Sequence, residues 1–417
     1  MSSGVITIED IKRARTTLEP VLEKTPMVRS DALSTKTQQV YLKLECLQRT
    51  GAFNIRGAYN KIANLSDEEK SHGIIASSAG NHVHGVALAA QQFGIHAVIC
   101  MPEETPYVKI EACSRYGAEV VLKGNDYDEA YEEAKRLADE NKYTYIHPFE
   151  DELVIAGQGT LCLDILDSIP DVDCIVVPIG GGGLIAGVAI AAKSINPNIE
   201  IIGVQAASSA AMQESISQGH LVTLKKAVTI ADEIQVRAAG TKTFSLLQTL
   251  PHKVRILAVS EDEISEAILF LLENQHVVAE GAGAVPVAAM LAGKIPSQFK
   301  KVCLLIAGGN INVTTISSII DRGLLSSKRR IRFKAIIDDK VGQVSRLASV
   351  IGDNKGNIFN INQTRQHQGM KLGYQEIDMV VDTAGSEHSE QILQALRKEG
   401  FRIKEDSIEI WEQDLGT

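Results

Sequence analysis

Residues 175–193 read IVVPIGGGGLIAGVAIAAK, and this stretch decides the class of fold. A short β-branched run, typical of a buried strand, is followed by four glycines and then by an Ala-rich helical pattern from Leu184. The glycines are Gly180, Gly181, Gly182 and Gly183. Their N–H groups, at the positive end of a helix, can surround a phosphate without a basic side chain. A tight turn with positive φ is the alternative, but one or two glycines would be enough for that.

The same alternation of strand and helix runs from about residue 5 to residue 322. Residues 97–101 form an apolar run ahead of a helix that starts near Pro106, and residues 120–123 precede a helical pattern over 127–141. Buried strands joined by helices form parallel sheets that are covered on both faces. The sequence therefore predicts an α/β protein with one or two doubly wound lobes.

A change of composition near residue 326 marks a second domain. The segment SSKRR at 326–330 interrupts the alternation and has little to bury, so we expect a linker at 326–331 between a domain of residues 1–325 and one of residues 332–417. Beyond the linker the pattern predicts strands at 332–337, 357–367, 372–382 and 402–404, with helices at 342–354 and 386–399. This βαββαβ order is the ferredoxin-like, split-βαβ arrangement of small α+β modules.

Composition excludes several classes of function. The chain has 417 residues, a formal net charge of -10 and no stripe of basic residues, which argues against a nucleic-acid partner. Its N-terminus has no apolar run like that of a signal peptide, and no segment has the length of a membrane span, so we expect a cytoplasmic protein without membrane contact. The six cysteines lie far apart without a CxxC pair, which favours buried free thiols over disulfides or a zinc site.

A second local motif is SSAGNHVHG at 77–85, where small residues lead into a helix. N–H groups at such a helix start can bind a carboxylate, and the amide of Asn81 can meet a hydroxyl or an oxyanion. A plain helix cap is the alternative interpretation. His82 and His84 have no neighbours at metal-ligand spacing, so we expect packing roles for them and predict no metal site.

Six motifs in order carry a resemblance to a known family. They are YLKLECLQRTGAFNIRGAYNKI (41–62), SSAGNHVHG (77–85), IAGQGT (155–160), PIGGGGLIAG (178–187), EGAGA (280–284) and AGGNIN (307–312). In sequence and spacing they resemble the fold type II, pyridoxal-phosphate-dependent threonine and serine dehydratases, especially the short biodegradative threonine ammonia-lyases, and serine racemase. The resemblance implies two lobes like those of the tryptophan synthase β subunit. The C-terminal segment is similar to an ACT domain, a module that binds small amino acids in relatives, with Gly342 at its ligand-loop glycine.

The resemblance also implies roles for individual residues. The glycines at 180–183, with Leu184, would hold the cofactor phosphate. Phe53 would lie beside the cofactor ring, Asn81 would meet its hydroxyl, and Glu280 would also sit near it. The loop that would receive the substrate carboxylate consists of Ser77, Ser78, Ala79, Gly80 and Asn81.

Three positions depart from the family pattern. Asn54, in the stretch AFNIRGA at 52–58, stands where the family has the lysine that forms the Schiff base. Ala307 stands where a Ser or Cys would bond the pyridine nitrogen of the cofactor, and Glu233, within ADEI at 231–234, replaces a glycine beside the cofactor. An amide is neither a nucleophile toward an aldehyde nor a base near neutral pH, so Asn54 cannot perform the lysine's chemistry. Lys43 and Lys61 are the lysines nearby in the sequence that could take over the role of the Schiff-base lysine.

Three interpretations follow from these departures. The first, which fits the most observations, is a non-catalytic homologue that binds a small amino acid or a phosphate-bearing ligand, with any pyridoxal phosphate held without a covalent bond. The second is different chemistry at a polar set formed by Asn54, Ser78, Asn81 and Glu233. The third is an ordinary threonine ammonia-lyase, converting L-threonine to 2-oxobutanoate and ammonia, in which Asn54 is an introduced residue. The family resemblance also implies a homo-oligomer, a dimer or tetramer.

Overall fold

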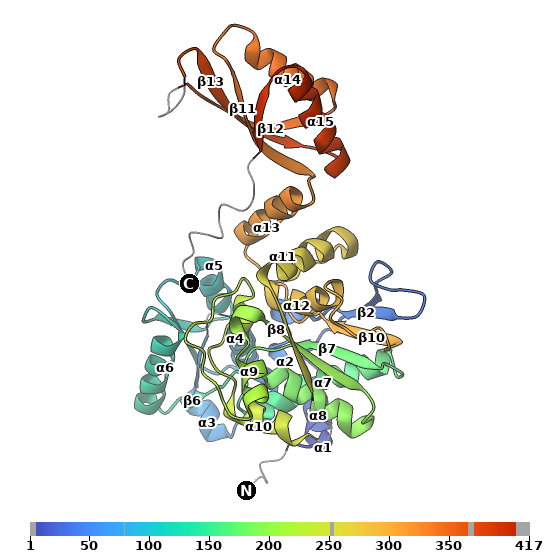
Figure 1. Cartoon of the computed structure of the whole chain (residues 1–417). Helices are drawn as coiled ribbons and strands as arrows, with labels where there is room; N and C mark the ends of the chain where they lie inside the picture. The colour runs from blue at the N-terminus through green and yellow to red at the C-terminus, as the bar shows by residue number, and fades with distance from the viewer. Residues whose placement is uncertain (1–5, 79, 251–253, 366–370, 406–417) are drawn as a thin grey trace. The chain divides into compact units, whose positions relative to one another are not determined.

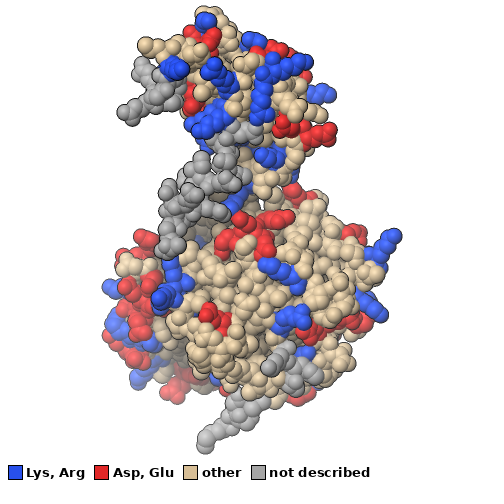
Figure 2. All heavy atoms as spheres, viewed as in Figure 1, with Lys and Arg blue, Asp and Glu red and all other residues tan. Residues whose placement is uncertain are grey.

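The computed structural model describes residues 6–78, 80–250, 254–365 and 371–405. The chain divides into two compact units, residues 1–311 and 312–417, and each is described by itself. On the face drawn in Figure 2, acidic and basic side chains are interspersed over the larger unit and leave broad uncharged areas between them. None of the helices among these residues is long and apolar enough to cross a membrane.

A six-stranded sheet forms the centre of the larger unit (Figure 1). In spatial order its strands are β1 (Met27–Arg29), β2 (Gln39–Lys43), β10 (Lys301–Leu305), β7 (Cys174–Pro178), β8 (Glu200–Ala206) and β9 (Arg255–Val259). Only β1 pairs antiparallel within this sheet. On β7, Ile175 and Val177 join the core formed with α7 and α8, and Val176, which points to the other face, is also fully buried. Both faces are therefore covered, as the sequence predicts.

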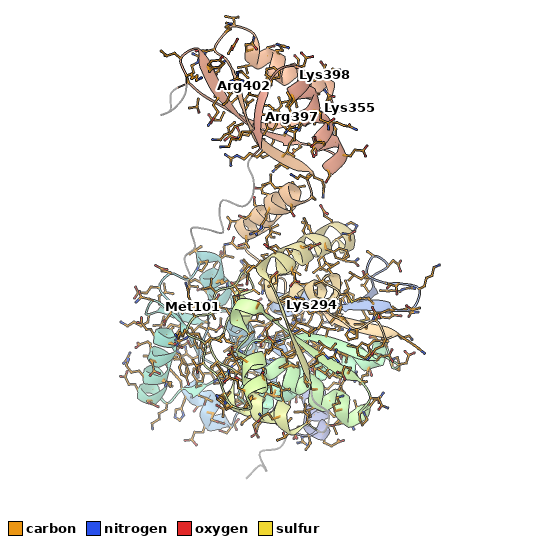
Figure 3. All side chains as sticks on the ribbon, in the orientation of Figure 1. Met101, Lys294, Lys355, Arg397, Lys398 and Arg402 are labelled. Atoms are coloured by element: carbon orange, nitrogen blue, oxygen red, sulfur yellow. The ribbon has the colours of Figure 1, made fainter. Side chains whose placement is uncertain are left out.

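A second, all-parallel sheet forms the smaller lobe of this unit. Its strands, in spatial order, are β5 (Glu119–Leu122), β4 (Ala97–Met101), β3 (Ile74–Ser77) and β6 (Thr144–Tyr145). Met101, labelled in Figure 3, is fully buried at the end of β4. The predicted doubly wound α/β architecture is thus confirmed as two lobes, each with its own sheet. The six cysteines are buried and unpaired.

Helices connect these strands in the order that the sequence pattern predicts. They are α1 (Ile8–Leu18), α2 (Ile55–Ala63), α3 (Asp67–His72), α4 (Asn81–Phe93), α5 (Tyr107–Ser114), α6 (Tyr127–Asn141), α7 (Glu152–Ser168), α8 (Gly183–Ile195), α9 (Ala211–Gln218), α10 (Thr241–Thr249), α11 (Glu261–Phe270) and α12 (Gly281–Leu291). Several begin with a side-chain cap. Thr7, Ser66 and Ser260 each form a capping box with an acidic residue three positions on.

Helix α7 packs between α2 and α8 through glycines. A Cβ on Gly157 would lie 2.4 Å from the carbonyl oxygen of Arg56 in α2, and one on Gly187 of α8 would lie 2.4 Å from that of Ile155 in α7. A Cβ on Gly159 would lie 2.8 Å from the carbonyl oxygen of Gly187. The atoms that an added Cβ would meet belong to the backbone, so no change of side-chain rotamer can relieve the contact. The three helices therefore approach as closely as they do only because glycine occupies these positions.

A buried ion pair fixes the turn that leads into α2. The Arg56 guanidinium is 1% exposed and donates to Glu45 Oε1 at 2.7 Å, to Asp164 Oδ2 at 2.7 Å and to Thr160 Oγ1 at 3.0 Å. Burial alone would raise the pKa of Glu45, but the Arg56 charge outweighs it and lowers the pKa. The pair joins the 45–51 segment, α2 and α7, so it holds the N-terminal end of α2 in place.

Where the structure describes it, the second unit contains a four-stranded antiparallel sheet and three helices. In spatial order the strands are β12 (Asn357–Thr364), β13 (Tyr374–Asp382), β11 (Arg330–Asp338) and β14 (Arg402–Glu405), and the helices are α13 (Val313–Ser326), α14 (Gln343–Asp353) and α15 (Ser386–Lys398). From β11 onward the order along the chain is βαββαβ, as predicted. Alternate residues of β13 are buried against α14 and α15, in a core that includes Ile377, Met379 and Leu347.

The connection between α13 and β11 is shorter than the linker expected at 326–331. Helix α13 continues to Ser326 and β11 already begins at Arg330. The Arg330 guanidinium, in the charged run that suggested a solvated linker, donates to Asp382 at 2.6 Å and to Asp321 at 2.7 Å. Ile331 is 6% exposed and belongs to the core of the unit. A buried apolar neighbour and two carboxylates thus extend the strand into a segment whose composition alone indicates a linker.

Replacing Gly157 by alanine tests the glycine-mediated packing of α7. The new methyl group would meet the backbone of Arg56, so Gly157→Ala should lower the free energy of unfolding of the larger unit by roughly 1–3 kcal/mol, despite the higher helix propensity of alanine. Urea titration followed by circular dichroism measures this loss. Gly352→Ala in α14 is the matched control, because nothing lies within 4 Å of its added methyl group. Equal stability of the two variants would contradict the packing argument.

Candidate functional site

The N-terminus of α4 is occupied by a carboxylate of the chain itself. Asn81 is the first residue of α4, and its backbone N–H donates to Glu233 Oε2 at 2.8 Å. A Cβ on Gly80 would lie 2.0 Å from the same oxygen, so the glycine leaves the room that the carboxylate needs. Glu233 comes from a short 3-10 turn, Asp232–Ile234. A carboxylate here is favoured because N–H groups at a helix start attract an anion.

Lys109 of α5 contacts the same turn. Its Nζ lies 2.7 Å from Asp232 Oδ2 and 3.3 Å from Glu233 Oε1, and its side chain is 19% exposed. Burial lowers the pKa of Lys109, but the two carboxylates outweigh that effect and raise it. Lys109 was not predicted from the sequence as a site residue. No motif surrounds Lys109, and only the fold brings it to a turn more than 120 residues away.

A closed hydrogen-bond network links Asn81 and Glu280, which the sequence predicted as site residues, to Asn310, which it did not. Asn81 Nδ2 donates to Glu280 Oε1 at 2.7 Å, and the backbone N–H of Asn310 donates to Glu280 Oε2 at 3.0 Å. The Asn310 side-chain amide in turn donates to Asn81 Oδ1 at 2.7 Å. Glu280 is 2% exposed. Asn310 lies within the quoted motif AGGNIN, which was the signal that could have identified it.

Both buried carboxyl groups resist ionisation. Burial raises the pKa of Glu233 to about 7, although Lys109 acts in the opposite direction. Burial also raises the pKa of Glu280 well above its ordinary value, and the charge of Glu233 adds to that rise. A carboxyl group with a pKa near 7 can exchange a proton at physiological pH, so the geometry offers one proton-transfer group at this helix terminus.

The four-glycine turn lies next to the turn that carries Glu233. A Cβ on Gly180 would lie 3.2 Å from the Cα of Ile234, so the two turns are in contact. Gly182 has φ of 100° and is the N-cap of α8, with no side-chain cap. A Cβ on Gly181 would lie 2.4 Å from the ring of Phe149. The positive φ and the close ring explain two of the four glycines, and the uncapped helix start leaves N–H groups available for an anion.

Asn54 precedes α2 and faces α4. An ideal Cβ on Gly85 would lie 3.1 Å from the carbonyl carbon of Asn54, and Gly85 is one turn beyond Asn81 on the same face of α4. Asn54 Oδ1 is buried and meets no hydrogen-bond donor in the described residues. The neighbouring Phe53 donates its backbone N–H to the carbonyl of Ala307 at 3.0 Å. The fold thus brings Phe53 against Ala307 and Asn54 against the first turns of α4.

The other predicted positions are distributed around α4 and α8. Ser77 is fully buried at the end of β3, and its hydroxyl meets no partner among the described residues. Ser78 accepts the backbone N–H of Gly80 at 2.9 Å, which is a cap-like role. The Leu184 side chain belongs to the hydrophobic core, so Leu184 can offer a ligand only its backbone N–H.

Ala79 lies outside the described residues. His82 is buried and bonds the carbonyl of Ile146 at 2.8 Å, a packing role.

The two lysines nearest to Asn54 in the sequence, Lys43 and Lys61, are bonded to other groups. Lys43 Nζ donates to the carbonyl of Thr25 at 2.8 Å and is buried. Lys61 Nζ pairs with Asp151 at 2.8 Å, two turns along α2 from Asn54. Burial lowers the pKa of Lys43, yet its amine is directed to the segment ahead of β1. Neither contact involves the α4 terminus.

Comparison with known proteins now adds to this geometry. Residues 18–308 match the family model described as pyridoxal-phosphate dependent enzyme, and residues 330–401 match the ACT domain. The chain belongs to the pyridoxal-phosphate-dependent enzyme family. It is 44% identical to an L-threonine ammonia-lyase of Thermotoga maritima over 96% of this chain and 99% of that protein. It is 45% identical to a catabolic L-threonine dehydratase of Staphylococcus aureus over 78% of this chain and 94% of that protein.

Solved structures support the same assignment. Maize serine racemase superposes with a TM-score of 0.71 and 34% identity, covering 76% of this chain and 98% of that one. The processed threonine deaminase isoform 2 of Solanum lycopersicum superposes with a TM-score of 0.70 and 36% identity, covering 75% and 87%. The fold class and the family inferred from the six motifs are confirmed.

The residues present fit the family's cofactor only in part. The glycine turn, with an uncapped helix N-terminus, suits a phosphate group. Asn54, the residue expected at the position of the family's lysine, is an amide whose buried oxygen has no partner among the described residues. An amide forms no covalent bond with an aldehyde. The glycine turn can therefore hold a phosphate group by non-covalent contacts, and the Asn54 side chain offers no amine for a covalent bond to an aldehyde.

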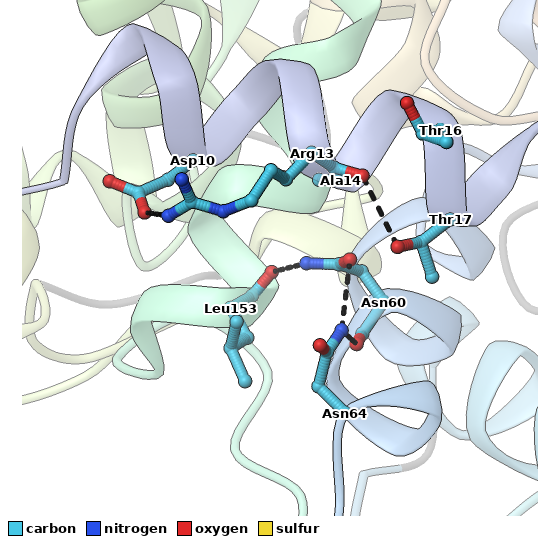
Figure 4. Close-up of a pocket in the computed structure, with 8 residues that line it drawn as sticks. All are labelled: Asp10, Arg13, Ala14, Thr16, Thr17, Asn60, Asn64 and Leu153. Atoms are coloured by element: carbon cyan, nitrogen blue, oxygen red, sulfur yellow. Dashed lines mark hydrogen bonds and ion pairs between the residues drawn. The ribbon is translucent and has the colours of Figure 1, made fainter.

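A cavity of about 400 Å³ lies elsewhere, against α1 and the C-terminal end of α2 (Figure 4). Its polar side chains already have hydrogen-bond or ion-pair partners within the protein. Asn60 Nδ2 donates to the carbonyl of Leu153 at 2.7 Å, Asn64 Nδ2 donates to the carbonyl of Asn60 at 2.8 Å, and Arg13 pairs with Asp10. It is far along α2 from Asn54, so we do not assign it to the family's chemistry.

The raised pKa of Glu233 predicts a specific dependence of stability on pH. Between its unfolded pKa near 4.5 and its folded pKa of about 7, the folded state holds a proton that the unfolded state has lost, so stability falls as pH rises. Glu233→Gln removes this titration. The variant should gain roughly 2–3 kcal/mol of unfolding free energy relative to the unaltered protein between pH 5 and pH 8.

Urea titrations at several pH values measure this difference. Glu263→Gln is the matched control, because the contacts of Glu263 with Lys294 and Ser260 lower its pKa and so place its titration below pH 5. Its stability curve should run parallel to that of the unaltered protein between pH 5 and pH 8. Parallel curves for Glu233→Gln as well would show that Glu233 is not a protonated carboxyl group in the folded protein.

Proposed function

We propose that this protein is a non-catalytic member of its family that binds a small phosphate-bearing ligand and serves a regulatory role. The observation that carries the proposal is Asn54, an amide where the resemblance to the family places the Schiff-base lysine. The chemistry of the family needs a primary amine to bond the cofactor and to move the α-proton. The three lysines discussed above, Lys43, Lys61 and Lys109, are each bonded to other groups.

Other features support binding rather than turnover. Ala307 has no polar atom for a pyridine nitrogen, and Glu233 brings a carboxylate to a position where the family has glycine. The glycine turn at 180–183 retains a form suited to a phosphate. The ACT domain at 330–401 is of a kind that binds amino acids, and we infer that it gives the protein a second ligand site. We place the protein in the cytoplasm as a homo-oligomer, with pyridoxal phosphate held, if it is the ligand, by non-covalent contacts.

A divergent reaction at the same site is the second candidate. The observation that favours it is the carboxyl group of Glu233, whose pKa of about 7 suits proton transfer near neutral pH. Its oxygen lies at the start of α4 beside Asn81. In that case Asn54, Ser78, Asn81 and Glu233 would be the polar groups around a phosphate-bearing substrate. Under both candidates we expect no ordinary conversion of L-threonine to 2-oxobutanoate and ammonia, which the third interpretation would require.

The absence of the amine predicts no ammonia release from L-threonine or L-serine, even with added pyridoxal phosphate. Borohydride treatment followed by mass spectrometry should find no covalently attached cofactor on the unaltered protein. Asn54→Lys should acquire one, yet should remain nearly inactive because of Ala307 and Glu233. Asn64→Lys, an exposed position at the other end of α2, is the matched control and should acquire none at that residue. Turnover by the unaltered protein near the ~10 s⁻¹ typical of enzymes would overturn the proposal.

The glycine turn is tested separately by Gly182→Asp. An aspartate there would place a carboxylate where an anion is expected, so calorimetry should show the loss of pyridoxal phosphate binding. Gly219→Asp is the control, because Gly219 also has positive φ but has open space around it. Circular dichroism checks that both variants fold. Binding that is unaffected by Gly182→Asp would leave the turn as an inherited structural feature.

A further inference from the structure

The anion position at the start of α4 is already filled. Glu233 accepts the backbone N–H of Asn81 at 2.8 Å, and its side chain is only 8% exposed. A carboxylate on a ligand would need this same N–H group. It would have to displace a carboxylate that is tethered to the chain and therefore present at high effective concentration.

A ligand carboxylate would also meet like charges. Asp232 is adjacent to Glu233 and brings a second carboxylate to this turn. Lys109 contacts Asp232 and Glu233, so its single positive charge is shared between two carboxylates. The groups around this helix terminus thus carry more potential negative than positive charge, and they favour a cationic neighbour over an anionic one.

Unpartnered acceptors give a second, independent indication. Ser77 is fully buried and its hydroxyl meets no partner in the described residues, and the same holds for the buried oxygen Asn54 Oδ1. Ser77 ends the strand that leads into α4, and Asn54 lies against Gly85 one turn into that helix. Buried acceptors without donors are costly, and an ammonium group supplies three donors.

The glycine turn supplies the complementary half of the site. It contacts the Glu233 turn, since a Cβ on Gly180 would lie 3.2 Å from the Cα of Ile234. The uncapped N-terminus of α8 favours an anion there, and the carboxyl groups a short distance away favour a cation. A molecule that spans the two would therefore be negative at one end and positive at the other.

We infer that the site selects a phosphate ester that bears a protonated amine and lacks a carboxylate, with Glu233 as the residue that excludes the carboxylate. The inference rests on the proposed function, in which the glycine turn binds a phosphate group. It assigns the departure at Glu233 a role in specificity and explains why the loss of the amine at Asn54 and the gain of an acid at Glu233 occur in one chain. In this inference the amine belongs to the ligand and not to a lysine of the protein, and the site supplies hydrogen-bond acceptors for it.

Two probes that differ in a single group test this selection. O-phosphoethanolamine carries a phosphate and an ammonium group, and O-phospho-L-serine carries the same groups and one carboxylate. Calorimetry on the full chain at pH 7.5 should give an affinity for O-phosphoethanolamine at least about 10-fold higher than for O-phospho-L-serine, the factor that corresponds to one modest charge interaction. Pyridoxal phosphate serves as the probe for the phosphate position alone.

The variant Glu233→Ala should change this preference. Removing the carboxylate frees the N–H of Asn81, so O-phospho-L-serine should gain affinity and the preference should fall to about 3-fold or less, or reverse. Asp232→Ala is the matched control. It removes a neighbouring carboxylate that also contacts Lys109 and that forms no bond to Asn81, so the preference should persist.

The outcomes separate the inference from the proposed function. Equal affinity for the two probes, or a preference that survives in Glu233→Ala, overturns the inference. Binding of pyridoxal phosphate without binding of O-phosphoethanolamine also overturns it and leaves the phosphate-binding function standing. Failure of all three probes to bind overturns both. Should Glu233→Ala fail to fold, Glu233→Gln removes the charge with the shape retained, and the preference for O-phosphoethanolamine should then weaken rather than persist.

Discussion

The close backbone packing of α2, α7 and α8 is the constraint on which the site depends. Asn54 stands at the N-terminus of α2 and the four-glycine turn at the N-terminus of α8. Helix α7 separates these two helices and touches both through backbone contacts at Gly157 and Gly187. Because backbone atoms cannot change rotamer to relieve a contact, the spacing between the two helix starts is fixed by the fold. The polar groups of the site are then placed by helices that do not move independently.

The sequence predicts most of the fold because the determining signals are local. The β-branched run before the glycines, the Ala-rich helices and the βαββαβ order of the last 86 residues each follow from periodicity and turn composition. Strand β11 begins at Arg330, inside the segment expected to be a linker, for a physical reason. A run of charges indicates a solvated segment, but Arg330 finds two carboxylates on neighbouring elements, and only the tertiary structure shows that they are there.

The sequence predicts which residues form the candidate site better than it predicts the hydrogen bonds between them. Asn54, Asn81, Glu233 and Glu280 stand in motifs that can be identified in the sequence. That the carboxylate of Glu233 bonds the first N–H of α4, with Lys109 beside it, depends on segments more than 120 residues apart. Periodicity gives no information about such contacts. The same holds for Asn310, whose amide closes the network around Glu280.

The carboxylate bonded to the start of α4 also affects the local stability of the protein when no ligand is bound. In a protein whose helix terminus is satisfied only by a bound anion, dissociation of the anion removes that contact, and the surrounding loop becomes more mobile. Here a residue of the chain itself, Glu233, accepts the first N–H group of α4. This helix terminus is therefore satisfied by the fold and does not depend on a bound anion for its stability.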